Sequence, residues 1–269
     1  MIKITTETGF THTLRPTLFP DGTSQVWKLP TEILESRELE ITWNFDDERE
    51  ILDLLSLRWL LPKQSWDLHI PFLPYARQDK TVSNTSTFNL VVLADLINEL
   101  GCNEVTSVDV HNPDRTTSLI HNFKNIEVTA LQELIIRENN IDLIVFPDLG
   151  AAGRYNAYSA LNRPVIICDK VRDQSTGNIT GHTMLSASAA TKDAPWNFLI
   201  IDDLCDGGAT FISVTRMLRD VYTPDQVGNI NLFVTHGVFS RGRQHLLNNG
   251  ITKVFTTNSL TKNGDGYQV

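Results

Sequence analysis

The sequence contains few of the residues that would indicate a disulfide-bonded or membrane-embedded protein. Its 269 residues include three cysteines, Cys102, Cys168 and Cys205. An odd number of widely spaced cysteines fits reduced thiols better than a disulfide framework or a zinc site. No apolar run approaches the roughly 20 residues that span a bilayer, and residues 1–7 contain no apolar signal-peptide core. We therefore expect a cytoplasmic protein without a membrane partner.

An excess of positive charge is also absent. Lys and Arg number 23 against 32 Asp and Glu, which gives a net charge of −9. This balance argues against a general nucleic-acid surface, although a nucleotide site needs only a few local cations. The hydrophobic share of 41% and the charged share of 20% are typical of a soluble globular protein. The length allows two α/β domains with cores of their own.

The most informative stretch runs from residue 198 to residue 210. Residues 198–201 form an apolar run that predicts a buried strand, and residues 211–218 have helical spacing. The polar and small residues between them are Asp202, Asp203, Asp206, Gly207, Gly208, Ala209 and Thr210. Amides at a helix N-terminus suit a phosphate, and carboxylates beside it suit sugar hydroxyls or magnesium. An ordinary turn with acids that cap the helix is the alternative.

The remaining chain alternates between apolar runs and helical patterns. Strands are expected at 39–43, 68–74, 105–110, 143–146, 165–168, 230–234 and 253–256, and helices at 46–61, 88–100 and 130–138. The pattern restarts near residues 125–129, which suggests a domain boundary. We therefore predict an α/β fold with domains at 1–128 and 129–269, each a mainly parallel sheet flanked by helices.

Several other polar segments follow predicted strands, where open α/β sheets bind ligands. Tyr75, Arg77, Gln78 and Asp79 could hold a nucleotide or form a solvated loop, and His111 could be structural or bind a metal. Asp148 follows the strand at 143–146. Lys170 and Arg172 are two residues apart in an extended segment, so both could reach one phosphate chain, although ordinary surface charges look the same. Residues 174–183 are polar enough to form a mobile loop.

These motifs together resemble the ribose-phosphate diphosphokinase family, in the family's order. Residues 74–79 are similar to its ATP-binding segment Pro-x-x-x-Tyr-Ala-Arg-Gln-Asp, and residues 202–210 to its phosphoribosyl pyrophosphate loop Asp-Asp-x-x-Asp-Thr-Gly-Gly-Thr. Shorter matches lie at residues 107–111, 147–150 and 235–240. Phosphoribosyltransferases share the loop but have no counterpart of residues 74–79, and we find no base-binding hood. A phosphoribosyltransferase is therefore the weaker reading.

The resemblance implies a type I phosphoribosyltransferase-like fold and a magnesium-dependent enzyme. It would transfer the diphosphoryl group of ATP to the anomeric hydroxyl of ribose 5-phosphate. ATP would be bound by Tyr75, Arg77, Gln78, Asp79 and His111, with Phe19 and Asp21 reaching a neighbouring subunit's adenine. Ribose 5-phosphate would be bound by Asp202, Asp203, Asp206, Gly207, Gly208, Ala209 and Thr210. Lys170 and Arg172 would stabilise the transition state, and the Mg²⁺ ligands would be His111, Asp148 and Asp202.

The sequence also departs from the family. Gly207 stands where the family has Thr, so one hydroxyl for the 5′-phosphate is missing, and Ala209 replaces a Gly. The extra room would also admit a ribose with a larger 5′ substituent, so ADP-ribose is an alternative acceptor. Residues 80–88 lack the arginines of the family's regulatory site, Thr23 replaces a Glu, and a C-terminal extension is largely missing. We therefore expect a homodimer, or a higher homo-oligomer, with reduced control. A non-catalytic regulatory homologue is a further alternative, although Lys170, Arg172 and His111 are all retained.

Overall fold

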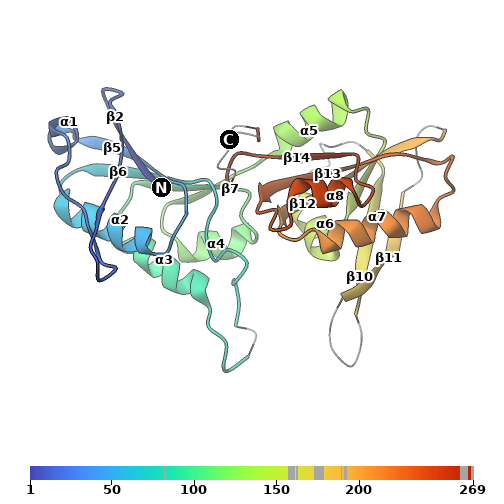
Figure 1. Ribbon diagram of the computed structural model, residues 1–269, viewed down its shortest axis with the longest axis horizontal. Coiled ribbons are helices and arrows are strands. Elements are labelled where there is room, and N and C mark those ends of the chain that lie inside the picture. Colours follow the sequence, from blue (N-terminus) through green and yellow to red (C-terminus); the bar gives the residue numbers. More distant parts are fainter. Residues whose placement is uncertain are drawn as a thin grey trace. The chain divides into compact units, whose positions relative to one another are not determined.

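The computed structural model describes residues 1–81, 83–156, 161, 163–172, 179–188, 190, 193–260 and 266–267. The chain forms two compact units, 1–126 and 127–269, which we call unit 1 and unit 2. Strands and helices alternate between residues 31 and 172 and again between residues 196 and 256, and the colours of Figure 1 follow this order along the chain. Each unit has its own sheet and its own buried cluster.

Unit 1 is built on a six-stranded sheet with the strand order β2-β1-β5-β6-β7-β8. Its strands are β1 (Ile2–Thr6), β2 (Thr11–Thr13), β5 (Glu38–Trp43), β6 (Ser65–Ile70), β7 (Glu104–Val108) and β8 (Phe123–Ile126). The strands from β5 to β8 run parallel, whereas β1 is antiparallel to both of its neighbours. Two short strands, β3 (Thr17–Leu18) and β4 (Ser24–Gln25), form a separate hairpin.

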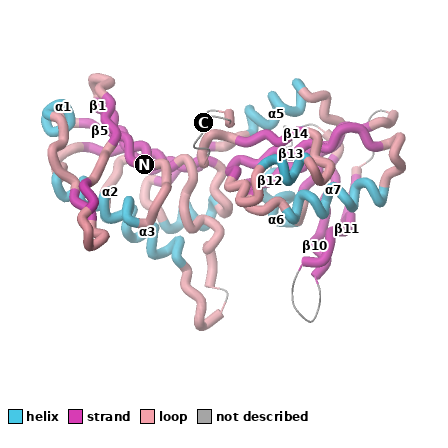
Figure 2. Tube along the Cα trace, in the orientation of Figure 1, coloured by secondary structure: helices cyan, strands magenta, loops and turns pink. Residues whose placement is uncertain are grey.

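One face of the unit 1 sheet carries the core. Alternate residues of β5 and β6, such as Leu39, Ile41 and Leu68, are at most 2% exposed. They cluster with residues at or next to the helices α1 (Thr31–Glu35), α2 (Arg49–Leu60), α3 (Asn89–Glu99) and α4 (Pro113–Leu119). Figure 2 shows α2 and α3 running side by side. The strand residues between them, such as Glu40 and Asp67, are exposed. Because successive side chains of a strand point to opposite faces, these two strands have one buried face and one polar face.

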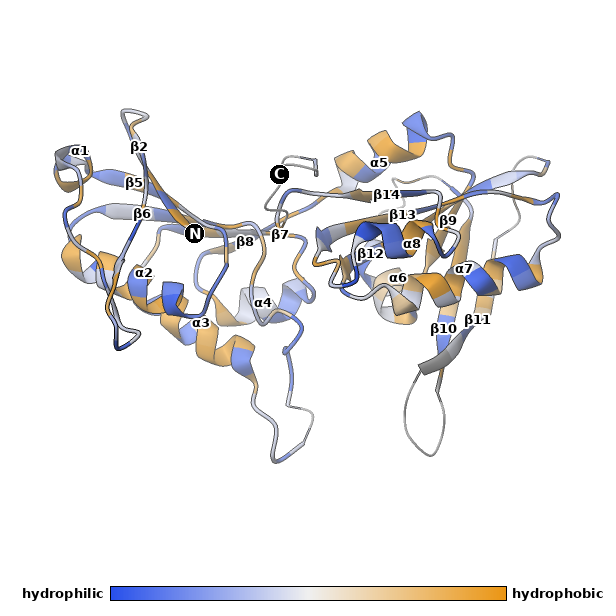
Figure 3. Ribbon diagram, in the orientation of Figure 1, coloured by the Kyte–Doolittle hydropathy of each residue, from blue (hydrophilic) through white to orange (hydrophobic). Residues whose placement is uncertain are grey.

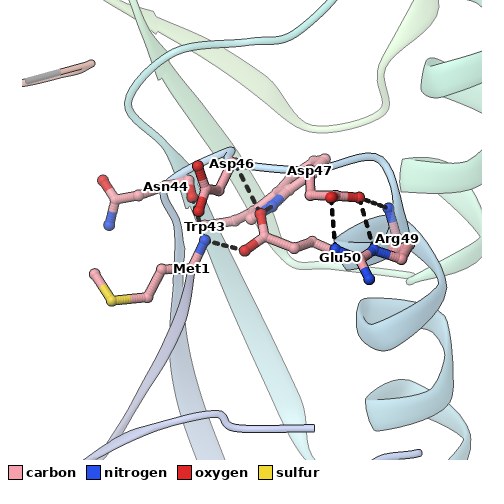
Figure 4. Close-up of polar contacts among 7 residues, drawn as sticks. All are labelled: Met1, Trp43, Asn44, Asp46, Asp47, Arg49 and Glu50. Carbon is pink, nitrogen blue, oxygen red and sulfur yellow. Dashed lines mark hydrogen bonds and ion pairs between the residues drawn. The ribbon is translucent and has the colours of Figure 1, made fainter. Parts of the chain in front are cut away.

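Glu50 fixes the start of α2 (Figure 4). Its carboxylate accepts hydrogen bonds of 2.9 Å from the indole of Trp43 and from the backbone amide of Asp46. It also pairs with the amino group of Met1. A carboxylate in the first helical turn is stabilised by the positive end of the helix dipole. The sequence predicted that this helix begins at Asp46, but Asp46 belongs to the capping contacts and the helix begins at Arg49.

Unit 2 is built on a second six-stranded sheet, in the order β11-β10-β9-β12-β13-β14. Its strands are β9 (Leu143–Phe146), β10 (Val165–Arg172), β11 (Ile179–Ala187), β12 (Trp196–Cys205), β13 (Val227–Gly237) and β14 (Lys253–Thr256). All of them run parallel except β11, which is antiparallel to β10. The adjacent strands β10, β9, β12 and β13 therefore end at the same edge of the sheet.

Helices cover both faces of the unit 2 sheet. On one face, α7 (Ala209–Val221) buries Phe211 and Leu218 in a cluster with strand residues such as Ile200. Figure 3 shows hydrophobic and hydrophilic residues on different sides of this helix. On the other face, Tyr155 of α6 (Leu149–Asn156) stacks on Phe146 with ring centroids 6.2 Å apart. The helices α5 (Thr129–Glu138) and α8 (Arg243–Leu247) also belong to this unit.

The predicted fold class is confirmed, because both units are mainly parallel sheets flanked by helices. Further predicted boundaries were wrong, beginning with the strand expected from residue 68, which is β6 at Ser65–Ile70. The run at 198–201 is the middle of β12, which stays paired with β13 as far as Cys205, so Asp202 and Asp203 lie in the strand. Of the predicted loop 174–183, residues 179–183 pair with β10 as part of β11, and residues 174–178 lie outside the described residues. No helix in the described part of the chain is long and apolar enough to cross a membrane.

Candidate active site

Charged side chains of unit 2 gather where three neighbouring parallel strands end. Lys170 lies near the carboxyl end of β10, and Asp148 follows β9 by two residues. Asp202 and Asp203 lie near the carboxyl end of β12. Because β9 pairs with both β10 and β12, these ends are adjacent. We call Lys170, Asp148, Asp202 and Asp203 the strand-end cluster.

Asp148 and Lys170 form an ion pair, with 2.5 Å between Oδ2 and Nζ, and both side chains are about a quarter exposed. The other carboxylate oxygen of Asp148 accepts a hydrogen bond of 2.8 Å from the amide of Ala151 in α6. Burial acts to raise the pKa of Asp148, but the hydrogen bonds from Lys170 and Ala151 and the nearby positive charges outweigh it and lower the pKa. Asp148 is therefore ionised and already paired.

Asp202 and Asp203 form a buried acidic pair beside Arg154 of α6. Nη1 of Arg154 lies 2.9 Å from Oδ1 of Asp203 and 3.8 Å from Oδ1 of Asp202. Burial, followed by the charge of Asp203, raises the pKa of Asp202 well above its ordinary value, although Arg154 acts in the opposite direction. One guanidinium serves two carboxylates, which leaves acceptor oxygens for sugar hydroxyls or a metal ion.

A tight turn of Asp206, Gly207 and Gly208 leads from β12 into α7. Gly208 has a φ of +81° and caps the helix. A β-carbon on Gly208 would lie 2.4 Å from Cδ2 of Leu246, which is closer than real β-carbons approach. The first amides of an α-helix have no acceptor within the helix and can bind a phosphate. Thr210, the second residue of α7, adds a hydroxyl to this turn.

The turn that follows β13 lies against the turn that follows β12. The backbone amides of Val238 and Phe239 both donate to the carbonyl of Cys205, at 2.9 and 3.1 Å. The amide of Gly242 donates to the carbonyl of Phe239 at 2.7 Å and closes the turn. Gly237 leaves room for the ring of Phe239, because a β-carbon there would lie 2.1 Å from Cε2 of that ring. Both turns are thus held at the same edge of the sheet.

In unit 1, the segment from Tyr75 to Asp79 lies beyond the carboxyl end of β6 and contacts the loop beyond β7. Oδ2 of Asp79 accepts a hydrogen bond of 2.7 Å from Nδ2 of Asn112, the residue after His111. Tyr75 has a φ of +62° and donates its hydroxyl to Glu48. This hydrogen bond, followed by burial, raises the pKa of Tyr75 to about 12. The segment and the histidine loop therefore form one group.

Four other residues predicted to bind ATP lie at the surface of unit 1. Arg77 and Gln78 are exposed, and Phe19, in the β3–β4 hairpin turn, is 40% exposed. Asp21 in the same turn accepts hydrogen bonds from the amide of Thr23 at 3.0 Å and from its hydroxyl at 2.7 Å. These bonds lower the pKa of Asp21. Asp21 is therefore engaged in its own turn, and a contact with adenine stays a prediction.

The structure thus brings predicted site residues together in two groups, one in each unit. The first contains the ATP-binding segment and the His111 loop, and the second contains the strand-end cluster and the turn into α7. Arg172 ends β10, but its side chain lies outside the described residues. The ligands that we assigned to both groups from the sequence stay predictions.

The sequence analysis missed two polar residues of the second group, Arg154 and His182. His182 lies opposite Lys170 in the β10–β11 pair and is 8% exposed. Neither of its ring nitrogens has a hydrogen-bond partner among the described residues. Burial, followed by the charge of Lys170, lowers the pKa of His182. Arg154 follows Asp148 by six residues, so a helix predicted at 149–156 would have indicated that it lies near Asp148. His182 comes near Lys170 only through the pairing of β11 with β10, which the sequence alone does not show.

The buried acidic pair fits a magnesium ion. Burial, followed by the negative charge of Asp203, raises the pKa of Asp202, and a divalent cation would stabilise the ionised form of this pair. Proteins usually hold Mg²⁺ through one or two carboxylates together with water and substrate phosphates. Within the residues that the structure describes, no group of three or more His, Cys, Asp or Glu side chains is placed to hold an ion alone. Asp202 and Asp148 are thus carboxylates that could share the ion with a bound phosphate chain.

The chain is similar to known ribose-phosphate pyrophosphokinases. It is 24% identical over 259 residues to the one from Saccharolobus solfataricus, which covers 91% of this chain and 84% of that protein. It is 29% identical over 202 residues to the one from Mycobacterium tuberculosis, which covers 71% of this chain and 58% of that protein. The structure matches phosphoribosylpyrophosphate synthetase from Mycobacterium smegmatis with a TM-score of 0.73 and 20% identity, over 94% of this chain and 83% of that one. No family model matches the chain.

The fold is that of a two-unit α/β protein with mainly parallel sheets, and it matches the fold of a phosphoribosylpyrophosphate synthetase. These similarities support a relationship to the ribose-phosphate pyrophosphokinases, and the low identities fit a divergent relative. The names of these relatives describe enzymes that transfer a diphosphoryl group.

Gly208→Ala should lower the free energy of unfolding by about 2 kcal/mol or more, because the left-handed φ and the contact with Leu246 both penalise a β-carbon. Gly207→Ala is the matched control, because its β-carbon would meet nothing closer than 3.7 Å and its φ is ordinary. Urea denaturation of the full chain measures both variants. Equal stability of the two variants would contradict this account of the turn.

Asp148→Asn should destabilise the protein at pH 7, by about 1 kcal/mol, because it removes a partly exposed ion pair. Asp148 has a folded-state pKa below its ordinary value of 3.8, so its contribution is fully present above pH 3.8 and disappears as the pH falls through the folded-state pKa. The difference between wild type and variant should therefore narrow in acid. Asp193→Asn, at an exposed position, is the control. A difference that stays constant down to pH 3 would refute the assignment.

Proposed function

We propose that the protein transfers the diphosphoryl group of ATP to the anomeric hydroxyl of ribose 5-phosphate, which yields phosphoribosyl pyrophosphate and AMP. The observation that carries this proposal is the strand-end cluster beside the glycine turn into α7. It places cations, acids and free helix amides at one edge of unit 2. A sugar phosphate that is to be diphosphorylated requires these three kinds of group.

The reaction needs the sugar hydroxyl in line with the β-phosphorus of ATP, and it spreads negative charge over the phosphate oxygens. We assign Asp202, Asp203 and Asp206 to the ribose hydroxyls. The amides of residues 207–210 and the hydroxyl of Thr210 receive the 5′-phosphate. Lys170 and Arg172 neutralise the charge that develops on the transferred group.

Lys170 is paired with Asp148, and its ammonium group has further N–H donors that could reach a phosphate oxygen. The same carboxylate is one that we assign to the metal ion. Lys170 therefore passes from Asp148 to the phosphate chain when the metal ion takes this carboxylate. This exchange substitutes one anionic partner for another, so the ammonium group never lacks a counter-charge.

For ATP we assign Tyr75, Arg77, Gln78, Asp79 and His111, with Phe19 and Asp21 in the hairpin turn. The contact of Asp79 with the loop that carries His111 supports this grouping within unit 1. Bound Mg²⁺ would be held by His111, Asp148 or Asp202 and would draw charge from the phosphate chain. We also propose a homodimer or higher homo-oligomer, in which the hairpin of one subunit reaches the adenine of ATP bound to its neighbour. Light scattering would establish the number of subunits.

The decisive assay incubates the protein with ATP, magnesium and either ribose 5-phosphate or ADP-ribose, and quantifies AMP and diphosphorylated sugar by mass spectrometry. We expect AMP and phosphoribosyl pyrophosphate with ribose 5-phosphate. Product formed with ADP-ribose but not with ribose 5-phosphate would support the same transfer reaction with a different acceptor. Gly207 leaves room for the larger 5′ substituent of that acceptor. Formation of no product with either sugar would overturn the proposal in favour of a regulatory homologue.

Lys170→Ala and Arg172→Ala should each lower kcat by about 10²-fold to 10³-fold, because each removes a donor that acts on transition-state charge. Lys253→Ala is the control for Lys170. Lys253 lies in β14 of the same unit and hydrogen-bonds only Asn139 among the described residues, so its removal should leave turnover within about twofold. Near-wild-type turnover of either active-site variant would remove that residue from the assignment.

A further inference from the structure

Arg241 lies beside Gly207, one of two glycines in the loop 206–210 that we assign to the sugar phosphate. A β-carbon on Gly207 would be 3.7 Å from Nε of Arg241 and 3.7 Å from Oγ of Ser240. These two donors therefore lie within side-chain reach of the point at which a threonine at position 207 would carry its hydroxyl. Both are in the turn that follows β13, on a different segment of the chain.

The position of this turn is fixed by the backbone. Val238 and Phe239 both donate to the carbonyl of Cys205, at the end of β12. The guanidinium of Arg243 lies 5.1 Å from the ring centroid of Phe239, which has a φ of +47°. The hydrogen bonds hold the turn against the end of β12, and the ring contact lies within the turn itself. Arg241, between them, is presented to the loop by a braced backbone.

The contacts of Arg241 indicate no role for this residue in the stability of the fold. It is exposed, and among the described residues its guanidinium makes no hydrogen bond or ion pair, even with Asp206 beside Gly207. A cation next to a helix N-terminus is electrostatically unfavourable, because the dipole is positive there. An anion bound at the start of α7 would reverse the sign of this interaction.

We propose that Arg241, with the hydroxyl of Ser240, replaces the threonine hydroxyl missing at position 207 and binds the 5′-phosphoryl group of the acceptor sugar. This inference rests on the proposed function and adds a specificity-determining residue to it. A guanidinium suits phosphate because it can donate two parallel hydrogen bonds. The group that it recognises is shared by ribose 5-phosphate and ADP-ribose, so the test includes both sugars.

The test compares wild type with Arg241→Gln and with Arg216→Gln. Arg216 is an exposed arginine of α7, the helix that begins at the loop. It lies seven residues beyond Ala209, the first residue of α7, and therefore about two turns from the loop. Isothermal titration calorimetry measures binding of ribose 5-phosphate, ADP-ribose and ATP, and steady-state assays give KM and kcat. Loss of a charge-assisted hydrogen bond should weaken binding of the acceptor about tenfold or more in Arg241→Gln. Binding of ATP, kcat at saturation and the melting temperature should not fall.

A rescue experiment separates phosphate recognition from a structural effect. Gly207→Thr is compatible with the backbone, since φ is ordinary and the exposed Arg241 can move aside. Added to Arg241→Gln, it should recover most of the lost affinity. In the wild-type background, Gly207→Thr should raise the affinity for the acceptor by less, because the threonine hydroxyl and Arg241 bind the same phosphate.

The outcomes distinguish this inference from the proposed function. Weaker binding of whichever sugar the wild type uses, restored by Gly207→Thr, supports the assignment for that sugar. Acceptor binding by Arg241→Gln as tight as by Arg216→Gln would overturn the role of Arg241 and leave the proposed function standing. Failure of the wild type to bind either sugar phosphate would overturn both.

Discussion

Parallel pairing of β10, β9, β12 and β13 is the constraint on which the candidate site depends. The register joins Ile167 to Phe146 and Ile200 to Val145, so the three strand ends reach the edge of the sheet together. The pairing of Cys205 with Gly237 brings in the fourth strand and its turn. A slip of one residue in any pair would turn alternate side chains to the opposite face. The core residues that set this register therefore also set the positions of the charged groups.

Cations of the protein partly neutralise the acids at this edge before any ligand binds. Lys170 neutralises Asp148, and Arg154 serves the acidic pair of Asp202 and Asp203. The two cations differ in what they can do next. Lys170 has a flexible stem and about a quarter of its surface exposed, so it can change partners. The side chain of Arg154 is 10% exposed and fixed between helix and strand, so it can only orient the acids that it contacts.

The sequence was sufficient for the class of fold and for most of the charged residues, because both depend on local patterns. Apolar runs of four or five residues identified strands such as β9, and acids or amides directly after them identified the ligand edge. The sequence could not show that Asp202 lies inside β12, because this part of the strand is formed by pairing with β13 and not by a run of apolar residues. His182 and Arg241 were not identified as site residues for a related reason. Each comes near the site through a strand or turn that is distant in sequence, and no local pattern reports such a neighbour.

The one-sided sheet of unit 1 has a consequence for how that unit unfolds. Its apolar strand residues face a single cluster, which residues from all four of the unit's described helices share. On the opposite face, strand residues such as Glu40 and Asp67 are exposed, although Val108 of β7 is buried outside that cluster. Separation of α2 or α3 from the sheet would therefore expose the same cluster that holds the other helices. Opening of one helix would thus weaken the packing of the others, and unit 1 should unfold as one cooperative block.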